Sequence, residues 1–188
     1  MDYLQEISRV FLTGEEETVI ENLYFDKPAL ISALEEKEHY RTNWNSLLSD
    51  LRKIRMDFSR VRDCEVFGQR HSYNASFQYD RGKKGVLFSV SFPFRVIGFR
   101  FAKFEEVEHS VSITKRYMEI LSYFPFDAEM LGIAEDIQNR MVSHFTDFEV
   151  FDNRDAANPI GLVLIDCKTY ADVDLWRVLF SINESGIF

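Results

Sequence analysis

Apolar residues recur at helical spacing through the first 62 residues of the chain. Residues 2–12 repeat them every three or four positions, and Gly14 follows as a stop signal. Thr13 and Glu16 have the spacing of a capping box, in which a hydroxyl and a carboxylate bind free backbone N–H groups at a helix start. The sequence therefore predicts one helix over residues 2–12 and a second over residues 15–25.

A third helix is predicted from Asp26, whose side chain can cap it, to about Phe58. Its second half carries an apolar stripe with alternating spacings of three and four, made of Trp44, Leu47, Leu51, Ile54, Phe58 and Val61. Such a stripe packs against a sheet or a helix of the same chain, or it pairs two copies of the chain. The register weakens at Lys37 and at Thr42-Asn43, so the pattern fits either one rod or two helices with a break.

The apolar period changes from 3.6 to two after residue 70. Large apolar and small polar residues alternate over residues 72–80 and 86–92, and a basic turn with two glycines joins these segments. Further alternation predicts strands over residues 97–101 and 106–114. Short connections favour an antiparallel meander with one buried face. The positions that this pattern turns toward water include Ser72, Asn74, Ser76, Ser89 and Ser91.

The pattern of apolar residues in the last third of the chain predicts an α–β–β segment. Asp127 can cap a helix whose buried stripe consists of Met130, Ala134, Ile137, Met141 and Phe145. Strands are predicted at residues 148–151 and 160–167, whereas residues 115–124 and 175–182 fit either a helix or a strand. The expected fold is one α+β domain with amino-terminal helices packed on a mostly antiparallel sheet. Its parts are a helical part (1–62), an antiparallel meander (63–114) and an acidic α/β part (115–188).

Charge is distributed unevenly along the chain, whose formal net charge is −9. Residues 105–188 contain 16 acids and 6 bases, a balance of −10, whereas residues 61–104 contain 3 acids and 8 bases, a balance of +5. A surface of one sign attracts oppositely charged partners and repels similar ones. We therefore expect a basic protein partner for an acidic carboxyl-terminal face, and nucleic acid is a disfavoured partner.

Several kinds of protein are excluded by what the sequence lacks. The longest uninterrupted apolar run has about five residues, far below the about 18 that a membrane-spanning helix needs. An acid, Asp2, stands where a secretory signal carries bases, so a cytoplasmic location is expected. Cys64 and Cys167 lack the spacing of a zinc site, and the four histidines are dispersed. No motif for a cofactor is found, so none is expected.

One segment has a pattern that could support catalysis. Asp152 or Asp155 precedes a predicted buried strand that ends in Asp166-Cys167-Lys168. Two carboxylates can hold a divalent metal ion, and a nearby lysine can orient the attacking water. Over about 40 residues this order resembles the core of PD-(D/E)xK nucleases, which implies Asp155, Asp166 and Lys168 as catalytic residues. Neither Asp152 nor Asp155 follows a proline, and the acidic surroundings would repel DNA, so this nuclease is the alternative function.

Acids and a large aromatic residue gather toward the end of the chain. Binding energy at protein interfaces concentrates in Trp, Tyr and Arg, while charges steer the partner. Trp176 stands beside aliphatic residues, so it fits either a buried position or an exposed anchor. The residues expected to bind a partner are Asp152, Asp155, Asp172, Asp174 and Trp176.

The sequence Asp174-Leu175-Trp176-Arg177-Val178-Leu179-Phe180-Ser181 resembles the end of small bacterial immunity proteins that neutralise polymorphic toxins. The size of the chain, its acidity and its lack of catalytic motifs are similar as well, and the resemblance covers about the last 60 residues. It implies a non-enzymatic protein that blocks the active site or substrate groove of a toxin. A third possibility is an oligomerising module built on the Trp44–Val61 stripe.

Overall fold

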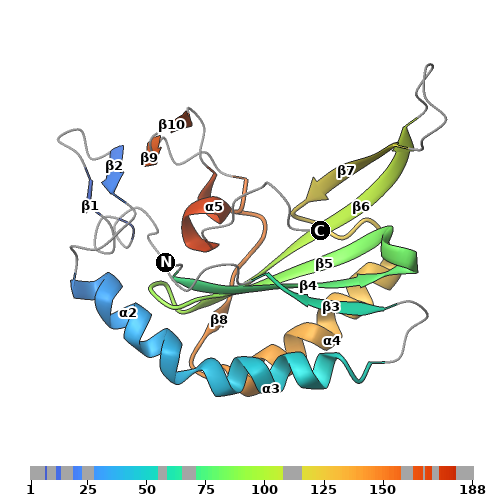
Figure 1. Cartoon of the computed structure of the whole chain (residues 1–188), viewed down its shortest axis with the longest axis horizontal. Helices are drawn as coiled ribbons and strands as arrows, with labels where there is room; N and C mark the ends of the chain where they lie inside the picture. The colour runs from blue at the N-terminus through green and yellow to red at the C-terminus, as the bar shows by residue number, and fades with distance from the viewer. Residues whose placement is uncertain are drawn as a thin grey trace.

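The protein combines helices with two β-sheets, which confirms the predicted α+β class (Figure 1). The structure is a computed structural model that describes residue 7 and residues 12–13, 19–22, 28–54, 59–64, 71–107, 116–157, 163–166, 168–170 and 174–180. The strands of the larger sheet are β3 (Arg60–Asp63), β4 (Ser72–Tyr79), β5 (Lys84–Ser91), β6 (Val96–Val107), β7 (Arg116–Ser122) and β8 (Glu149–Val150).

The long strand β6 organises the larger sheet. One of its edges pairs antiparallel with β5 over eight positions, from Val96 opposite Ser91 to Lys103 opposite Lys84. The other edge is shared by two strands, because β8 pairs in parallel with the start of β6 and β7 pairs antiparallel with its second half. The sheet order is therefore β3-β4-β5-β6-β7, with β8 beside β6.

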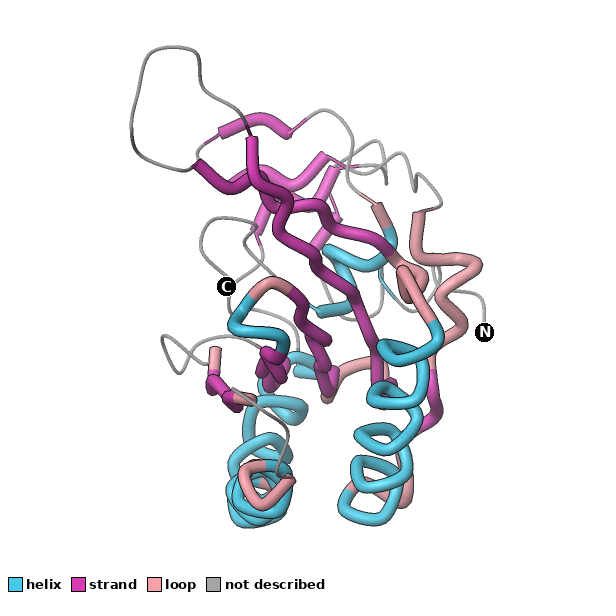
Figure 2. The backbone as a smooth tube through the Cα atoms, turned by 90° about the vertical axis from the view of Figure 1, so that its right-hand side faces the viewer, coloured by secondary structure: helices cyan, strands magenta, loops and turns pink. Residues whose placement is uncertain are grey.

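A second, smaller sheet joins segments that are far apart in the sequence. Its strands are β1 (Leu12–Thr13), β2 (Val19–Asn22), β9 (Val163–Asp166) and β10 (Lys168–Tyr170). The β2 and β9 strands pair in parallel, whereas the other two pairings are antiparallel. In Figure 1 the strands of this sheet lie on the opposite side of the larger sheet from the long helices, and Figure 2 shows the long helices together on one side of the strands.

The helices lie on both faces of the larger sheet. On one face lie α2 (Pro28–His39), α3 (Arg41–Leu51) and α4 (Ala128–His144), and on the other lies the short α5 (Leu175–Phe180) (Figure 1). A 3-10 turn, η1 (Asp80–Gly82), joins β4 to β5. None of the helices in the described ranges has both the length and the apolar character needed to cross a bilayer.

The main core forms between the long helices and the alternating apolar residues of the sheet. Trp44 of α3 stacks on Tyr73 of β4 with ring centroids 5.0 Å apart, and it also contacts Phe88 of β5. The predicted inward positions of β4 and β5 are all buried, namely Tyr73, Ala75, Phe77, Tyr79, Val86, Phe88 and Val90. The strand periodicity therefore identified this core correctly.

The apolar stripe of the third predicted helix packs within its own chain. Trp44, Leu47 and Leu51 are fully buried against the sheet and α4, so these side chains are not available to pair two copies of the chain. The helix is broken at Tyr40 and ends at Leu51, and Val61, expected in the same stripe, lies in β3. Two helices with a break are one of the two arrangements that the sequence allowed. The second helix ends at Leu51, earlier than the predicted end near residue 58, and residues 55–58 lie outside the described ranges.

The opposite face of β4 and β5 does not face water. Ser72, Asn74, Ser76, Ser89 and Ser91 are all buried, which contradicts the prediction of a solvent-exposed face. The carboxyl end of α5 provides the physical reason, since its last carbonyls need hydrogen-bond donors. The Ser72 hydroxyl donates to Phe180 O at 2.6 Å, and Asn74 Nδ2 donates to Ser72 Oγ at 3.0 Å. Ser72, supported by Asn74, thus forms the hydrogen-bonded contact of this face with the helix end.

The amino-terminal helices predicted from local signals are partly replaced by strands. Thr13, expected to cap a second helix, lies in β1, and residues 19–22 form β2 inside the predicted helix 15–25. Val19 and Ile20 are β-branched, and they pair with Val163 and Leu164 of β9. Long-range pairing therefore overrides the capping signal, because a cap contributes only about 1 kcal/mol.

The predictions for the middle of the chain are confirmed in part. The third strand is longer than predicted, because β6 continues to Val107, and the remainder of the predicted fourth strand lies outside the described residues. The ambiguous residues 115–124 contain the strand β7, and residues 175–180 form a helix. The helix α4 begins after Asp127 as predicted, since the Asp127 carboxylate accepts a 2.8 Å hydrogen bond from Met130 N.

The contact of α5 with the sheet depends on a glycine of β6. Gly98 lies directly under the rings of Phe180 and Trp176, whose centroids are 4.2 Å apart. A Cβ atom at this position would lie 2.5 Å from the Trp176 ring, closer than any normal contact. The missing side chain lets the helix approach the strand closely.

We expect Gly98→Ala to lower the free energy of unfolding by about 1–3 kcal/mol, because two buried rings would have to shift. Gly132→Ala on α4 is the matched control, since its added Cβ meets nothing within 4 Å, and alanine is favoured over glycine in a helix by up to about 1 kcal/mol. Urea unfolding of both variants measures the difference. Equal stabilities would contradict the close contact at Gly98.

Candidate functional site

Residues 147–155, which we call the edge strip, run along the edge of β6 and continue beyond β8. Its backbone is tied to the sheet. Glu149 N donates to Arg95 O at 2.9 Å, and Phe151 N donates to Ile97 O at 2.8 Å. These bonds fix the path of the strip relative to the rigid centre of the sheet.

Two side chains of the strip are buried and anchor it to the protein, while most of the others point outward. Phe148 and Phe151 point inward and are 5% and 4% exposed, and Ala156 just beyond the strip is fully buried. The outward side chains are those of Asp147, Glu149, Val150, Asp152, Arg154 and Asp155. The strip therefore presents four carboxylates and one exposed valine on a backbone that is hydrogen-bonded to β6.

Asn153 joins the strip to β6 and to the end of β7. Its side-chain Nδ2 donates to Phe99 O at 2.9 Å and to Tyr123 O at 2.7 Å. The Tyr123 hydroxyl in turn donates to an Asp174 carboxylate oxygen at 2.5 Å. The predicted binding residues Asp152 and Asp174 are thus brought into one region, although more than 20 positions separate them in the sequence.

Trp176 belongs to this region but does not lie on its surface. Its backbone N–H donates to Ala156 O at 3.3 Å, which places the first turn of α5 beside the end of the strip. Its side chain is fully buried between Tyr123, Phe151 and Phe180. The expectation that Trp176 could serve as an exposed anchor is therefore not met, and its role is to support the strip from beneath.

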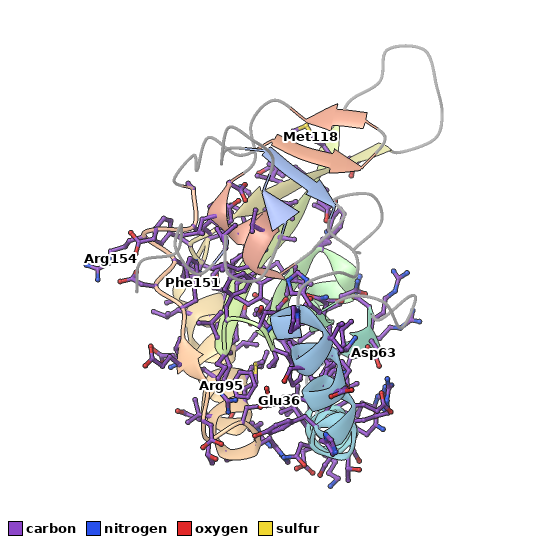
Figure 3. The ribbon with its side chains drawn as sticks, turned by 90° about the vertical axis from the view of Figure 1, so that its left-hand side faces the viewer. Glu36, Asp63, Arg95, Met118, Phe151 and Arg154 are labelled. Atoms are coloured by element: carbon purple, nitrogen blue, oxygen red, sulfur yellow. The ribbon has the colours of Figure 1, made fainter. Side chains whose placement is uncertain are left out.

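Arg95 lies next to the strip and pairs with two carboxylates, those of Glu36 and Asp147; Figure 3 labels Arg95 and Glu36. Its Nη1 contacts a Glu36 carboxylate oxygen of α2 at 2.7 Å, and its Nη2 lies 3.6 Å from an Asp147 oxygen. The guanidinium also lies 5.2 Å from the ring centroid of Phe148. Arg95 has a backbone φ of 52°, a left-handed value that turns the chain from β5 into β6.

Asp152 is paired within the strip itself. Arg154 Nε donates to both of its carboxylate oxygens, at 2.9 and 3.0 Å, and Arg154 Nη2 also contacts Asp152. The Arg154 side-chain hydrogen bonds and the Arg154 backbone N–H lower the pKa of Asp152 to about 2. Asp152 therefore stays charged in all but strongly acidic solution. Arg154 extends outward in Figure 3, with 82% of its side chain exposed.

The acids of residues 105–188 are not all gathered on one face. Lys84 of β5 binds Asp127 at 2.8 Å and Glu129 at 3.2 Å, and Arg140 binds Asp136 at 3.2 Å. The described acids of this part are therefore spread over several elements; the edge strip holds four of them, of which Asp147 and Asp152 pair with Arg95 and Arg154. Residues 147–155 carry four acids and one base, a formal balance of −3.

The residues of the alternative nuclease site are distributed over different elements. Asp166 ends β9 and Lys168 begins β10, and these two positions face each other across an antiparallel pair. The acid and the lysine thus lie on two strands, not on one strand as the nuclease pattern requires. Asp155 follows β8 of the larger sheet, and Asp172 lies outside the described residues.

Sequence reasoning missed Asp147, Glu149 and Val150, which the structure places on the same strip as Asp152 and Asp155. Phe148 and Phe151 could have indicated them, because two large apolar residues that flank exposed positions anchor a surface segment. Within the described ranges, no three His, Cys, Asp or Glu side chains are close enough together to hold a metal ion.

Comparison of the chain with protein families, with curated proteins and with solved structures finds no match.

The Asp152–Arg154 pair gives a direct test of this geometry. We expect Arg154→Gln to raise the pKa of Asp152 from about 2 toward the ordinary value of about 3.9. Carboxyl-carbon NMR titration measures this pKa. Arg140→Gln, which removes another exposed arginine, should leave it unchanged, and an unaltered pKa in Arg154→Gln would show that the pair is absent in solution.

Proposed function

We propose that this protein is a non-enzymatic binding protein whose edge strip binds a basic protein, and that this partner is a toxin whose active site it blocks. The observation that carries the proposal is the way in which the strip is held. Phe148, Phe151 and Asn153 fix its backbone to the sheet, while its carboxylates remain exposed. A partner therefore meets charges that are already in place, so little ordering cost is added on binding.

The charges on the strip favour a cationic partner. Exposed ion pairs each contribute only about 0–1 kcal/mol, so the carboxylates act mainly on the rate of association and on the choice of partner. Val150, 41% exposed between Glu149 and Asp152, adds an apolar contact within the acidic segment. Steering by charge combined with apolar contact is a common arrangement at protein interfaces.

The toxin is the partner class implied by the resemblance of residues 174–181 to immunity proteins. The described part of that segment forms α5, whose first turn is bonded to Ala156 at the end of the strip. A toxin that acts on a polyanion has a basic groove, and fixed carboxylates that occupy this groove would exclude its substrate. Neutralisation would then require no chemistry by the protein itself.

We expect the triple variant Glu149→Gln, Asp152→Asn and Asp155→Asn to bind its partner about tenfold more weakly at low salt, mainly through slower association. The partner to test is the product of a toxin-sized reading frame adjacent to the gene. Stopped-flow association at low and high salt provides the measurement, and survival of cells that produce the toxin provides the functional readout.

The matched control removes three exposed carboxylates elsewhere, with Glu35→Gln, Glu38→Gln and Glu135→Gln. Both triple variants have a net charge of −6 in place of −9. A difference in their binding therefore reports the position of the removed carboxylates and not the total charge. The proposal fails if the neighbouring product does not bind, or if association is fast and independent of salt.

A further inference from the structure

Four short polar side chains form a buried group on the face of the larger sheet that carries α5. Ser72 stands opposite Ser91 in the pairing of β4 with β5, and Asn74 stands opposite Ser89. Residues opposite each other in an antiparallel pair point to the same face, with Cβ atoms about 5 Å apart. Each of the four is at most 3% exposed. We call Ser72, Asn74, Ser89 and Ser91 the polar cluster.

Hydrogen bonds within the protein satisfy only part of the polar cluster. The Ser72 hydroxyl donates to Phe180 O, and it accepts a hydrogen bond from Asn74 Nδ2. Asn74 Oδ1, Ser89 Oγ and Ser91 Oγ are buried, and none of them has a hydrogen-bond partner in the part of the chain that the structure describes. Buried polar groups of folded proteins are nearly always bonded, either to the protein or to an ordered water molecule. Three neighbouring atoms of the cluster therefore need a common partner.

The atoms of the cluster define the chemistry of this partner. It is neutral, because the cluster carries no charge and a buried ion would lose its hydration without compensation. It donates to Asn74 Oδ1, which can only accept, and it can donate to or accept from the two hydroxyls. It is also small, because the Phe180 ring covers Gly98, the β6 partner of Ser89. Water meets all of these conditions.

We propose that the polar cluster binds one ordered water molecule, which donates to Asn74 Oδ1 and is hydrogen-bonded to the hydroxyls of Ser89 and Ser91. A buried water typically makes about three hydrogen bonds to polar groups that otherwise have no partner. This water extends a chain of bonds that runs from Asn74 through Ser72 to Phe180 O. It therefore stabilises the contact between the sheet and the end of α5, and it requires neither the edge strip nor a protein partner.

Removal of each hydroxyl tests the site through the sign of the effect. We expect Ser89→Ala and Ser91→Ala each to raise the equilibrium constant for unfolding about fivefold, because a hydrogen bond to the water is lost. A buried hydroxyl without any bond gives the opposite sign, since its removal relieves a desolvated polar group. Ser72→Ala is the matched control and is expected to destabilise the protein, because Ser72 is bonded to Phe180 O. Urea unfolding measures all three variants. Unchanged or higher stability of Ser89→Ala or Ser91→Ala would overturn the proposal.

A crystal structure of the full-length protein identifies the partner itself. We expect one well-ordered water molecule about 3 Å from Asn74 Oδ1 and from both serine oxygens. A side chain of the protein in this place, or well-ordered cluster side chains with no water between them, would overturn the proposal even if the serine variants are destabilised. Neither outcome affects the proposed function, because the edge strip takes no part in the polar cluster.

Discussion

The hydrogen bonds along the outer edge of β6 are the constraint on which the rest of the candidate site depends. They hold β8 and the edge strip at one end of the strand and β7 at the other. Asn153 of the strip closes the gap between them, since its amide group donates to the carbonyl of Phe99 in β6 and to that of Tyr123 just after β7. The opposite edge of β6 is paired with β5 over eight positions, so the strand cannot shift without disrupting the centre of the sheet. The backbone of this border is therefore bonded to the same strand that borders the core.

Much of the fold could be predicted where local pattern and burial agree. The helix α4 was found from its capping Asp127 and its apolar stripe, and the core face of β4 and β5 was found from alternation. The other face of those strands was misjudged, because serine and asparagine are usually exposed, yet here Ser72 binds the carboxyl end of a helix more than 100 positions away. The strand β2 was also missed, since its partner β9 is distant and a local window does not contain it.

The candidate site was predictable only in its charges. Asp152 and Asp155 are exposed as an acidic surface requires, but the sequence does not reveal that Arg154 binds Asp152 or that Lys84 binds Asp127 and Glu129. Such pairs depend on the rotamers and spacing that the folded backbone sets. Trp176 was the least certain position, because a tryptophan among aliphatic residues fits either a core or an interface. Its burial follows from Gly98, whose significance becomes visible only when the two elements are seen in contact.

The parallel pairing of β2 with β9 has a consequence for the order in which the molecule assembles. Val19 and Val163 face each other although 144 positions separate them. During synthesis the amino-terminal segment leaves the ribosome long before its partner exists, whereas the β4–β5 hairpin can close as soon as its own turn has emerged. The smaller sheet can therefore form only late, once β9 and β10 have emerged, and of the described elements only α5 follows it in the sequence.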